Sequence, residues 1–326
     1  MLFGKKKRHV SLDYNDFGLQ VLTYSSADLS QAKAYSIPLD EGIVVEGIIE
    51  DELAFFELLK EQVKNWGIKG QNVRFFVPES TVMMKSIDHP KELVDKKAIK
   101  EYVEMELGRA IHLPFENPLI DIYDAKQGDG KATIFATNAE EVQKVVSILM
   151  DAGLTPAVAD IKVISLIRFV DRILPNLADT TSLIVNWSIN EISLAIYSFG
   201  EVEFLRFQMI ETERSKWQSR YTEDGFEYVY QDDISHYQMA LMDSIAEIER
   251  IINFYRFSLN KGEKGVEQIV VMGDSPELSY IAKTIEGQGA IPVHIFTDQM
   301  IADAFPNFKS SQASLISLAL KEDVKA

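Results

Sequence analysis

The chain has 326 residues, of which 46% are hydrophobic, so it is long enough to bury the cores of two ordinary domains. Its formal net charge of −17 repels polyanions and argues against a nucleic-acid partner. It contains no cysteine, which excludes disulfides, a thiolate nucleophile and cysteine-ligated zinc, and which suits a reducing cytoplasm.

A basic run, Lys5–Arg8, lies near the start of the chain. No apolar segment of signal-peptide length follows it, and no later stretch approaches the roughly 18 apolar residues of a membrane span. We therefore expect a soluble protein. The run either touches an anionic membrane surface or serves as solubilising decoration of the chain end, and we favour the second interpretation.

The first domain is predicted from the order of its elements. These are a hairpin over 9–24, a strand over 31–37, a helix over 51–66 and a strand over 72–77. In the helix, Leu53, Phe56, Leu59 and Val63 recur at helical spacing. Three strands, a helix and a strand are the core order of a ribonuclease-H-like domain.

A compact β-α-β-β-α module follows and looks inserted, because an apolar strand and helix over 157–173 then resume the first domain. Its predicted elements are a strand over 81–87, a helical stretch over 90–111, strands over 119–123 and 132–137 joined by a turn at Gly128–Gly130, and a helix over 138–152.

The second half begins with a copy of the first hairpin. Residues 182–197 align with 9–24 without a gap, which places Trp187 opposite Tyr14 and Tyr197 opposite Tyr24. The later predictions are a strand over 201–209, a long helix over 233–259, a strand over 268–273, a helix from Pro276, a strand over 292–296 and a helix over 312–321.

Two features of the second half carry further expectations. On the long helix, the predicted face consists of Met239, Met242, Ile245, Ile248, Ile252 and Tyr255. Before it, the aromatic residues Trp217, Tyr221, Phe226, Tyr228 and Tyr230 form either an interaction patch or a small aromatic core.

The predicted fold class is α/β, with two ribonuclease-H-like domains in tandem and a small module inserted in the first. We divide the chain into a first domain (1–78, 157–179 and 309–326), the inserted module (79–156) and a second domain (180–308), in which 210–265 is an elaboration.

This organisation resembles the actin-like ATPase superfamily. The inserted position is similar to that in FtsA and, more closely, to that in the PilM family of type IV pilus assembly proteins. Matches to the PilM family include Glu104–Phe115 with Leu119–Asp121, Ala152–Pro156 with Asp160, and Glu249–Phe257. Each stretch also suits a structural role, so we use them to identify the fold.

The resemblance implies a nucleotide site between the two hairpins, and this sequence departs from it. An active hairpin carries an acidic residue and, two positions later, a glycine that lets backbone N–H groups approach the phosphates. Asp13 remains, but Asn15, Asn186 and Ser188 replace the other three residues. An amide does not replace a carboxylate opposite Mg²⁺.

A third element is the turn after strand 268–273, where Gly273 and Ser275 flank Asp274, which adds negative charge beside an anionic ligand. The predicted nucleotide site is therefore degenerate. We expect a relic fold without catalytic residues, cofactor or metal site rather than a weakened pocket for ATP and Mg²⁺. We expect hydrolysis of ATP even less than its binding.

The PilM resemblance also implies a partner, the cytoplasmic tail of a PilN-like membrane protein, held between the first domain and the insert. By topology we place Val77, Glu79, Met83 and Lys85 on the outgoing strand, with Thr155 and Ala157 on the return crossing. The expectation is a non-catalytic adaptor in type IV pilus or pseudopilus assembly, cytoplasmic and peripheral at the inner face of the membrane.

Other outcomes remain open. Contacts with the assembly ATPase or the platform protein and a homo-oligomer are further implications of the family. One alternative is an ATP-binding switch with slow or no hydrolysis, and another is an FtsA-like filament at the membrane.

Overall fold

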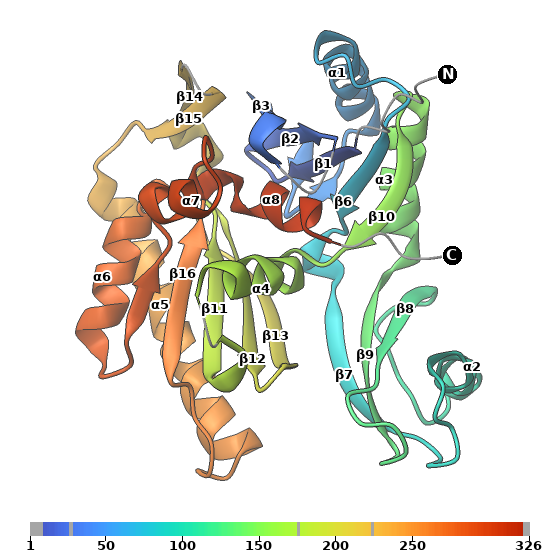
Figure 1. The fold of residues 1–326 in the computed structure, drawn as a ribbon. Helices are drawn as coiled ribbons and strands as arrows, with labels where there is room; N and C mark the ends of the chain where they lie inside the picture. The colour runs from blue at the N-terminus through green and yellow to red at the C-terminus, as the bar shows by residue number, and fades with distance from the viewer. Residues whose placement is uncertain (1–8, 26–28, 175–176, 223–224, 322–326) are drawn as a thin grey trace.

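The computed structural model describes residues 9–25, 29–174, 177–222 and 225–321. Two five-stranded sheets lie side by side, with helices between them and on their outer faces, and a smaller lobe extends from the first sheet (Figure 1). The basic run Lys5–Arg8 lies outside the described residues.

The first sheet has the strand order β3-β2-β1-β6-β10. Its strands are β1 (His9–Tyr14), β2 (Gly18–Tyr24), β3 (Lys33–Pro38), β6 (Asn72–Phe76) and β10 (Thr155–Asp160). The first three are antiparallel, and β6 and β10 continue the sheet in parallel with β1. This is the ribonuclease-H-like core that the sequence predicts.

The second sheet repeats that order as β13-β12-β11-β16-β17. Its strands are β11 (Thr181–Trp187), β12 (Glu191–Ser198), β13 (Glu201–Met209), β16 (Gln268–Gly273) and β17 (Val293–Ile295). The register repeats as well, because His9 pairs with Tyr24 in the first hairpin and Ser182 with Tyr197 in the second. The gapless sequence repeat is thus a repeat of structure.

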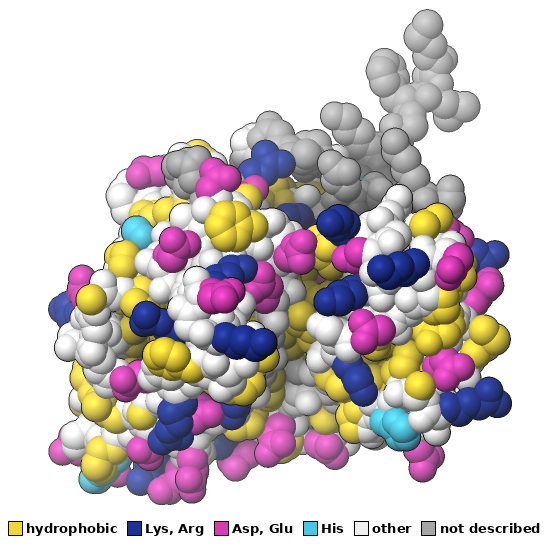
Figure 2. Space-filling model, turned by 90° about the horizontal axis from the view of Figure 1, so that it is seen from below, with side chains coloured by type: hydrophobic (Ala, Val, Ile, Leu, Met, Phe, Trp, Pro, Cys, Tyr) yellow, Lys and Arg dark blue, Asp and Glu magenta, His cyan; other side chains and the backbone are white. Residues whose placement is uncertain are grey.

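The inserted module has a three-stranded sheet of order β7-β9-β8 covered by α2. Its elements are β7 (Met83–Asp88), α2 (Lys96–Glu106), β8 (Pro118–Tyr123) and β9 (Lys131–Asn138). Ile99 and Val103 of α2 pack on Ile134 in a core of their own. Viewed from below, acidic, basic and hydrophobic side chains are intermixed, and a hollow separates two masses (Figure 2).

Helix α3 (Ala139–Asp151) was expected to complete the module, but it packs on the first domain. Its Val145 and Leu149 share a core with Phe55 and Leu59 of α1 (Glu52–Asn65). An amphipathic stripe shows that a helix buries one face, but not against which element. By packing, the module therefore ends at β9.

On α1 the buried stripe is Phe55, Leu59 and Val63, whereas Leu53, expected on that face, is 66% exposed. Asp51 caps the helix by accepting the Ala54 N–H at 2.9 Å. Two short strands, β4 (Val44–Val45) and β5 (Ile48–Ile49), precede it.

Helices α4 (Lys162–Ile173) and α8 (Ala313–Ala319) join the two domains. They lie between the sheets in Figure 1, and a core cluster that includes Leu166, Ile316, Leu22 of β2 and Ile184 of β11 spans both domains. Arg74 of β6 donates to the carbonyl oxygens of Leu318, Ala319 and Lys321 at the end of α8, at 3.0, 3.2 and 2.6 Å.

The elaboration of the second domain is a hairpin and a long helix. The elements are β14 (Trp217–Thr222), β15 (Gly225–Tyr230), α5 (Ile234–Asn253) and a π-helical continuation (Phe254–Leu259). Helices α6 (Leu278–Gln288) and α7 (Asp298–Ala304) complete the domain, and the sequence reading did not anticipate α7.

The buried face of α5 differs from the expected one. Met239 and Met242 are exposed, and Tyr237 and Leu241 take the buried positions. The aromatic stretch before the helix forms a core, since Trp217 and Tyr228 are buried, whereas Tyr221 is exposed.

Candidate functional site

The turns of the two repeated hairpins face each other across a cavity of about 20 Å³. Five of the six residues predicted for a nucleotide site line it, namely Asp13, Asn15, Asn186, Ser188 and Gly273. Ser275 lies just beyond, buried, with its Oγ accepting the Glu277 N–H at 3.4 Å. The residues predicted for the degenerate site therefore lie close together at the cleft.

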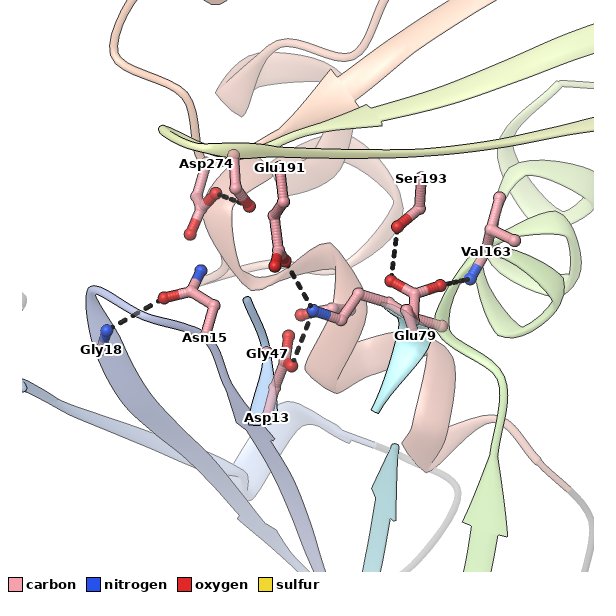
Figure 3. A network of polar contacts seen from close by, with 12 residues as sticks. Asp13, Asn15, Gly18, Gly47, Glu79, Val163, Glu191, Ser193 and Asp274 are labelled. Carbon is pink, nitrogen blue, oxygen red and sulfur yellow. Dashed lines mark hydrogen bonds and ion pairs between the residues drawn. The ribbon is translucent and has the colours of Figure 1, made fainter. Parts of the chain in front are cut away.

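A lysine that sequence reasoning missed occupies the centre of this site. The Nζ of Lys162, the first residue of α4, lies 3.1 Å from Oδ1 of Asp13 and 3.5 Å from Oε1 of Glu191. Figure 3 shows Asp13 of β1 and Glu191 of β12 reaching the same point, with Glu79 nearby and turned to Ser193 and Val163. The retained acid of the first hairpin is thus paired with a cation that belongs to the protein.

The charges of this cluster shift one another's pKa. Burial raises the pKa of Glu191 to about 8 and also raises the pKa of Glu79. Burial alone would lower the pKa of Lys162, but Asp13, Glu191 and Glu79 raise it well above its ordinary value. The cluster therefore favours the charged form of Lys162, and burial favours the protonated form of Glu191 and Glu79.

Asn15 satisfies the backbone of its own turn. Its Oδ1 accepts the N–H groups of Phe17 and Gly18, both at 2.9 Å. These are the kind of turn amides that approach a phosphate when the position holds glycine. The Asn15 side chain therefore stands where a ligand oxygen would accept.

Hydrogen bonds within the protein also occupy polar groups of the second hairpin and of the turn after β16. Ser188 Oγ donates to Oδ1 of Asp274 at 2.6 Å, and the Ser188 N–H donates to the Glu191 carbonyl oxygen at 2.9 Å. Burial raises the pKa of Asp274. The N–H groups of Asp274 and Ser275 both donate to the Trp187 carbonyl oxygen, at 3.0 and 3.1 Å.

Gly273 has a backbone role in this arrangement. Its φ is +127°, and a Cβ at this position would overlap the backbone of Trp187, its partner in register on β11. Only glycine accepts both the conformation and the contact. The glycine that sequence reasoning assigned to a nucleotide pocket is required by strand pairing.

The tips of the two hairpins are joined to each other. Asn190 Nδ2 donates to Oδ2 of Asp16 at 2.7 Å. Phe17, at the tip of the first hairpin, is buried in the aromatic core of the second domain, with ring centroids 5.0 Å from Tyr228 and 6.2 Å from Trp217. The protein's own side chains therefore hold the two domains together at the cleft.

The residues present do not fit a nucleotide with its magnesium ion in this arrangement. A cavity of about 20 Å³ holds about one water molecule, because one water needs roughly 10–15 Å³. The acid Asp13, the turn amides of Phe17 and Gly18, and the Ser188 hydroxyl are already paired within the protein. Further out, between Tyr35, Phe226 and Gln312, the cleft widens into a second cavity of about 340 Å³.

Two of the residues predicted to bind a partner are buried. Val77 packs in the core of the first domain, and the carboxylate of Glu79 accepts hydrogen bonds from Val163 N and Ser193 Oγ. Neither residue is available at the surface, because the chain stays buried from β6 until it enters the insert.

The other four predicted partner residues lie on two elements. Met83 and Lys85 are on β7, where Met83 packs against the core of the module and Lys85 Nζ donates to the His112 carbonyl oxygen at 3.0 Å. Thr155 and Ala157 are exposed on β10, the edge strand of the first sheet. None of the four lines either cavity of the interdomain cleft.

Only a weak sequence signal points to Lys162. It lies two positions after the end of β10 and begins a helix whose next two residues, Val163 and Ile164, are apolar. Its partners Asp13 and Glu191 are 149 positions earlier and 29 positions later, so no local motif contains the cluster.

Comparisons with known proteins agree with this architecture. The family model of the type IV pilus assembly protein PilM matches residues 19–319. A solved PilM–PilN type IV pilus biogenesis complex is similar over 97% of this chain and 98% of the other, with a TM-score of 0.74 and 17% identity. No curated protein sequence matches the chain.

Two more distant structures share the fold. The ethanolamine utilization protein EutJ from Carboxydothermus hydrogenoformans has a TM-score of 0.53 and 8% identity over 97% of this chain and 90% of the other. A Bacteroides thetaiotaomicron protein with an actin-like ATPase fold and unknown function has a TM-score of 0.51 and 11% identity over 97% of both chains. The predicted actin-like fold is confirmed.

Proposed function

Because the chain belongs to the family of the type IV pilus assembly protein PilM, we propose that it is a non-catalytic adaptor in type IV pilus or pseudopilus assembly. Its partner is the cytoplasmic tail of a PilN-like membrane protein. The observation that carries the non-catalytic part is the ion pair of Lys162 with Asp13, which places a protein cation at the degenerate nucleotide site.

Three independent features support a cleft that works without nucleotide. Lys162 neutralises the retained acid, the Asn15 side chain occupies the turn amides, and Phe17 fills the core of the second domain. An actin-like site needs that acid for the metal and those amides for the phosphates. The first two features each remove one of these requirements, and the third joins the two domains beside the cleft.

The partner surface that we propose uses the exposed edge of the first sheet. Strand β10 pairs only with β6 among the described strands, and a bulge between Pro156 and Val158 interrupts that ladder. An extended peptide binds such an edge by adding a strand, with alternate side chains providing specificity. Thr155 and Ala157 are the exposed positions of this strand, and Met83 and Lys85 are the candidate contact positions on the module.

Association with the membrane would be through this partner. Among the described residues, no helix combines the length and the apolar character that crossing a bilayer requires. We propose a position at the cytoplasmic face, where the assembly ATPase and the platform protein are further candidate contacts.

A peptide titration tests the adaptor function. The probe is a synthetic peptide with the cytoplasmic tail sequence of the PilN-like protein from the same organism, titrated into the full chain by calorimetry. We expect saturable binding that Ala157→Arg weakens at least tenfold, about 1.4 kcal/mol. The control Ala125→Arg changes another exposed alanine, on the far side of the module, and should leave the affinity unchanged.

Absence of peptide binding to the wild-type chain would contradict the adaptor function, and equal affinities for the wild type and Ala157→Arg would contradict the β10 surface.

A second titration addresses the nucleotide. We expect no saturable heat with Mg-ATP, whereas micromolar affinity would favour the ATP-binding switch, which the outer cavity of about 340 Å³ leaves room for. Sedimentation velocity of the same sample tests the filament alternative, for which large assemblies would be the supporting result.

A further inference from the structure

The root of the inserted module is bonded to two other parts of the protein. The chain enters the module through a 3-10 turn (Glu79–Thr81) between β6 and β7. Within it, the buried Glu79 carboxylate accepts the Val163 N–H of α4 at 3.1 Å and the Ser193 hydroxyl of β12. Figure 3 shows these three residues together. One side chain thus links the module to the connecting helix and to the second domain.

Helix α4 depends on this contact. The first N–H groups of a helix have no partner inside it and need an acceptor. Ile161, at the cap position, provides no side-chain acceptor. Glu79 provides one from the module's root, and its charge also suits the positive end of the helix dipole. The first turn of α4 and the root of the module therefore keep a fixed geometry.

The same turn of α4 points Lys162 to the other side, into the cleft. There it pairs with Asp13 of the first domain and Glu191 of the second. The first domain, the second domain and the module therefore meet at two adjacent residues of α4, Lys162 and Val163. We name the side chains of Asp13, Glu79, Lys162, Glu191 and Ser193 the three-way joint.

Beyond its root the module lies beside the second domain, where β7 runs next to β13. The Tyr123 hydroxyl of β8 lies 3.4 Å from the carbonyl oxygen of Gly200, in the turn after β12. Between the two contacts is a groove of about 420 Å³, lined by Ser86 and Thr133 of the module and by Glu201. The hydrogen bond between the module and the second domain at the joint is therefore buried, whereas the one at Tyr123 is exposed.

We propose that the three-way joint couples closure of the interdomain cleft to the orientation of the inserted module. The cleft opens only if Lys162 leaves Asp13 and Glu191, because these residues belong to different domains. That movement displaces the first turn of α4, on which Glu79 rests, and the module turns with it. A ligand or partner that moves the module therefore also acts on the cleft, whatever the identity of that partner.

Pulsed electron paramagnetic resonance tests the coupling directly. The chain has no cysteine, so Lys97→Cys on α2 and Met239→Cys on α5, both exposed, take nitroxide labels without further changes. We expect one narrow distance distribution for the otherwise unchanged chain. Lys162→Met should shift and broaden it, and Ser193→Ala, which removes one hydrogen bond to Glu79 and no charge, should broaden it less.

The matched control is Arg168→Met, on the same helix. Arg168 pairs with Asp160 at 2.6 Å and has no contact with the joint, so the distribution should stay that of the parent chain. A parent-like distribution in folded Lys162→Met would overturn the proposal. If Lys162→Met does not fold, Ser193→Ala decides, and an unchanged distribution in that variant would overturn it equally.

Discussion

Gly273 of β16 and Trp187 of β11 are paired in register so closely that a Cβ on the glycine would overlap the carbonyl oxygen of the tryptophan. We predict that Gly273→Ala destabilises the protein strongly. The left-handed backbone region alone costs about 1–3 kcal/mol, and the overlap adds to it. Urea unfolding measures the loss.

The control for this prediction is Gly287→Ala, in α6. A Cβ there meets no atom within 4 Å, and the helical position favours alanine by up to about 1 kcal/mol. Wild-type stability in Gly273→Ala would show that strand pairing is not what requires the glycine.

Removing the cation of the cleft should be costly. In Lys162→Met, Asp13 and Glu191 lose the buried positive charge between them, and such losses typically cost about 3–5 kcal/mol. The comparison is Arg220→Met, which breaks the exposed pair with Glu227 and should change stability by less than about 1 kcal/mol. Equal losses of stability in the two variants would contradict a large contribution of the buried ion pair to the free energy of unfolding.

A double variant separates the charge from the packing. Adding Asp13→Asn to Lys162→Met removes the unpaired carboxylate, so part of the lost stability should return. A further loss instead would mean that Asp13 has another partner in the folded protein.

The stability should depend on pH through Glu191. Its pKa is raised by burial from 4.5 to about 8. Between these values the unfolded chain releases the proton while the folded protein keeps it, so rising pH lowers the stability by up to about 1.4 kcal/mol per unit. Glu191→Gln is neutral at every pH, and we expect it to gain stability relative to the wild type from pH 5 to pH 9.

Urea midpoints at pH 5, 7 and 9 measure this trend. Glu61→Gln, on the exposed side of α1, is the control and should track the wild type throughout. A constant difference between Glu191→Gln and the wild type would contradict the raised pKa.

Phe17 should matter more for the joining of the domains than its place at a hairpin tip suggests. Phe17→Ala leaves a cavity beside Tyr228 and Trp217 and should cost about 3–5 kcal/mol. Because the ring crosses from the first domain into the second, we also expect the calorimetric transition to broaden or split. Leu53→Ala, at a 66% exposed position, should leave a single transition near that of the wild type.

The repeated hairpins were predictable because their information is local. Alternating apolar residues determine strand pairing, and the gapless repeat carried the register from His9–Tyr24 to Ser182–Tyr197. Strand β16 agrees with the expected residues, 268–273, because a buried strand is a continuous apolar run.

Contacts between distant elements were not predictable in this way. On α5, Met239 and Tyr237 both fit a helical stripe, and only the neighbouring strands decide which is buried. The nucleotide residues were identified from single hairpins and one turn, whereas Lys162 acts through partners from two domains. Glu79 looked like a groove residue because nothing local shows that Ser193 lies opposite it.

Arg74 has a practical consequence for handling this protein. Its guanidinium holds the carbonyl oxygen of Lys321 at 2.6 Å, and the ammonium of Lys321 lies 2.9 Å from Asp160. A purification tag or reporter joined after Lys321 keeps these contacts. One that truncates the chain before Leu318 takes these carbonyl acceptors away from a buried guanidinium, and would report on a destabilised protein instead of the native one.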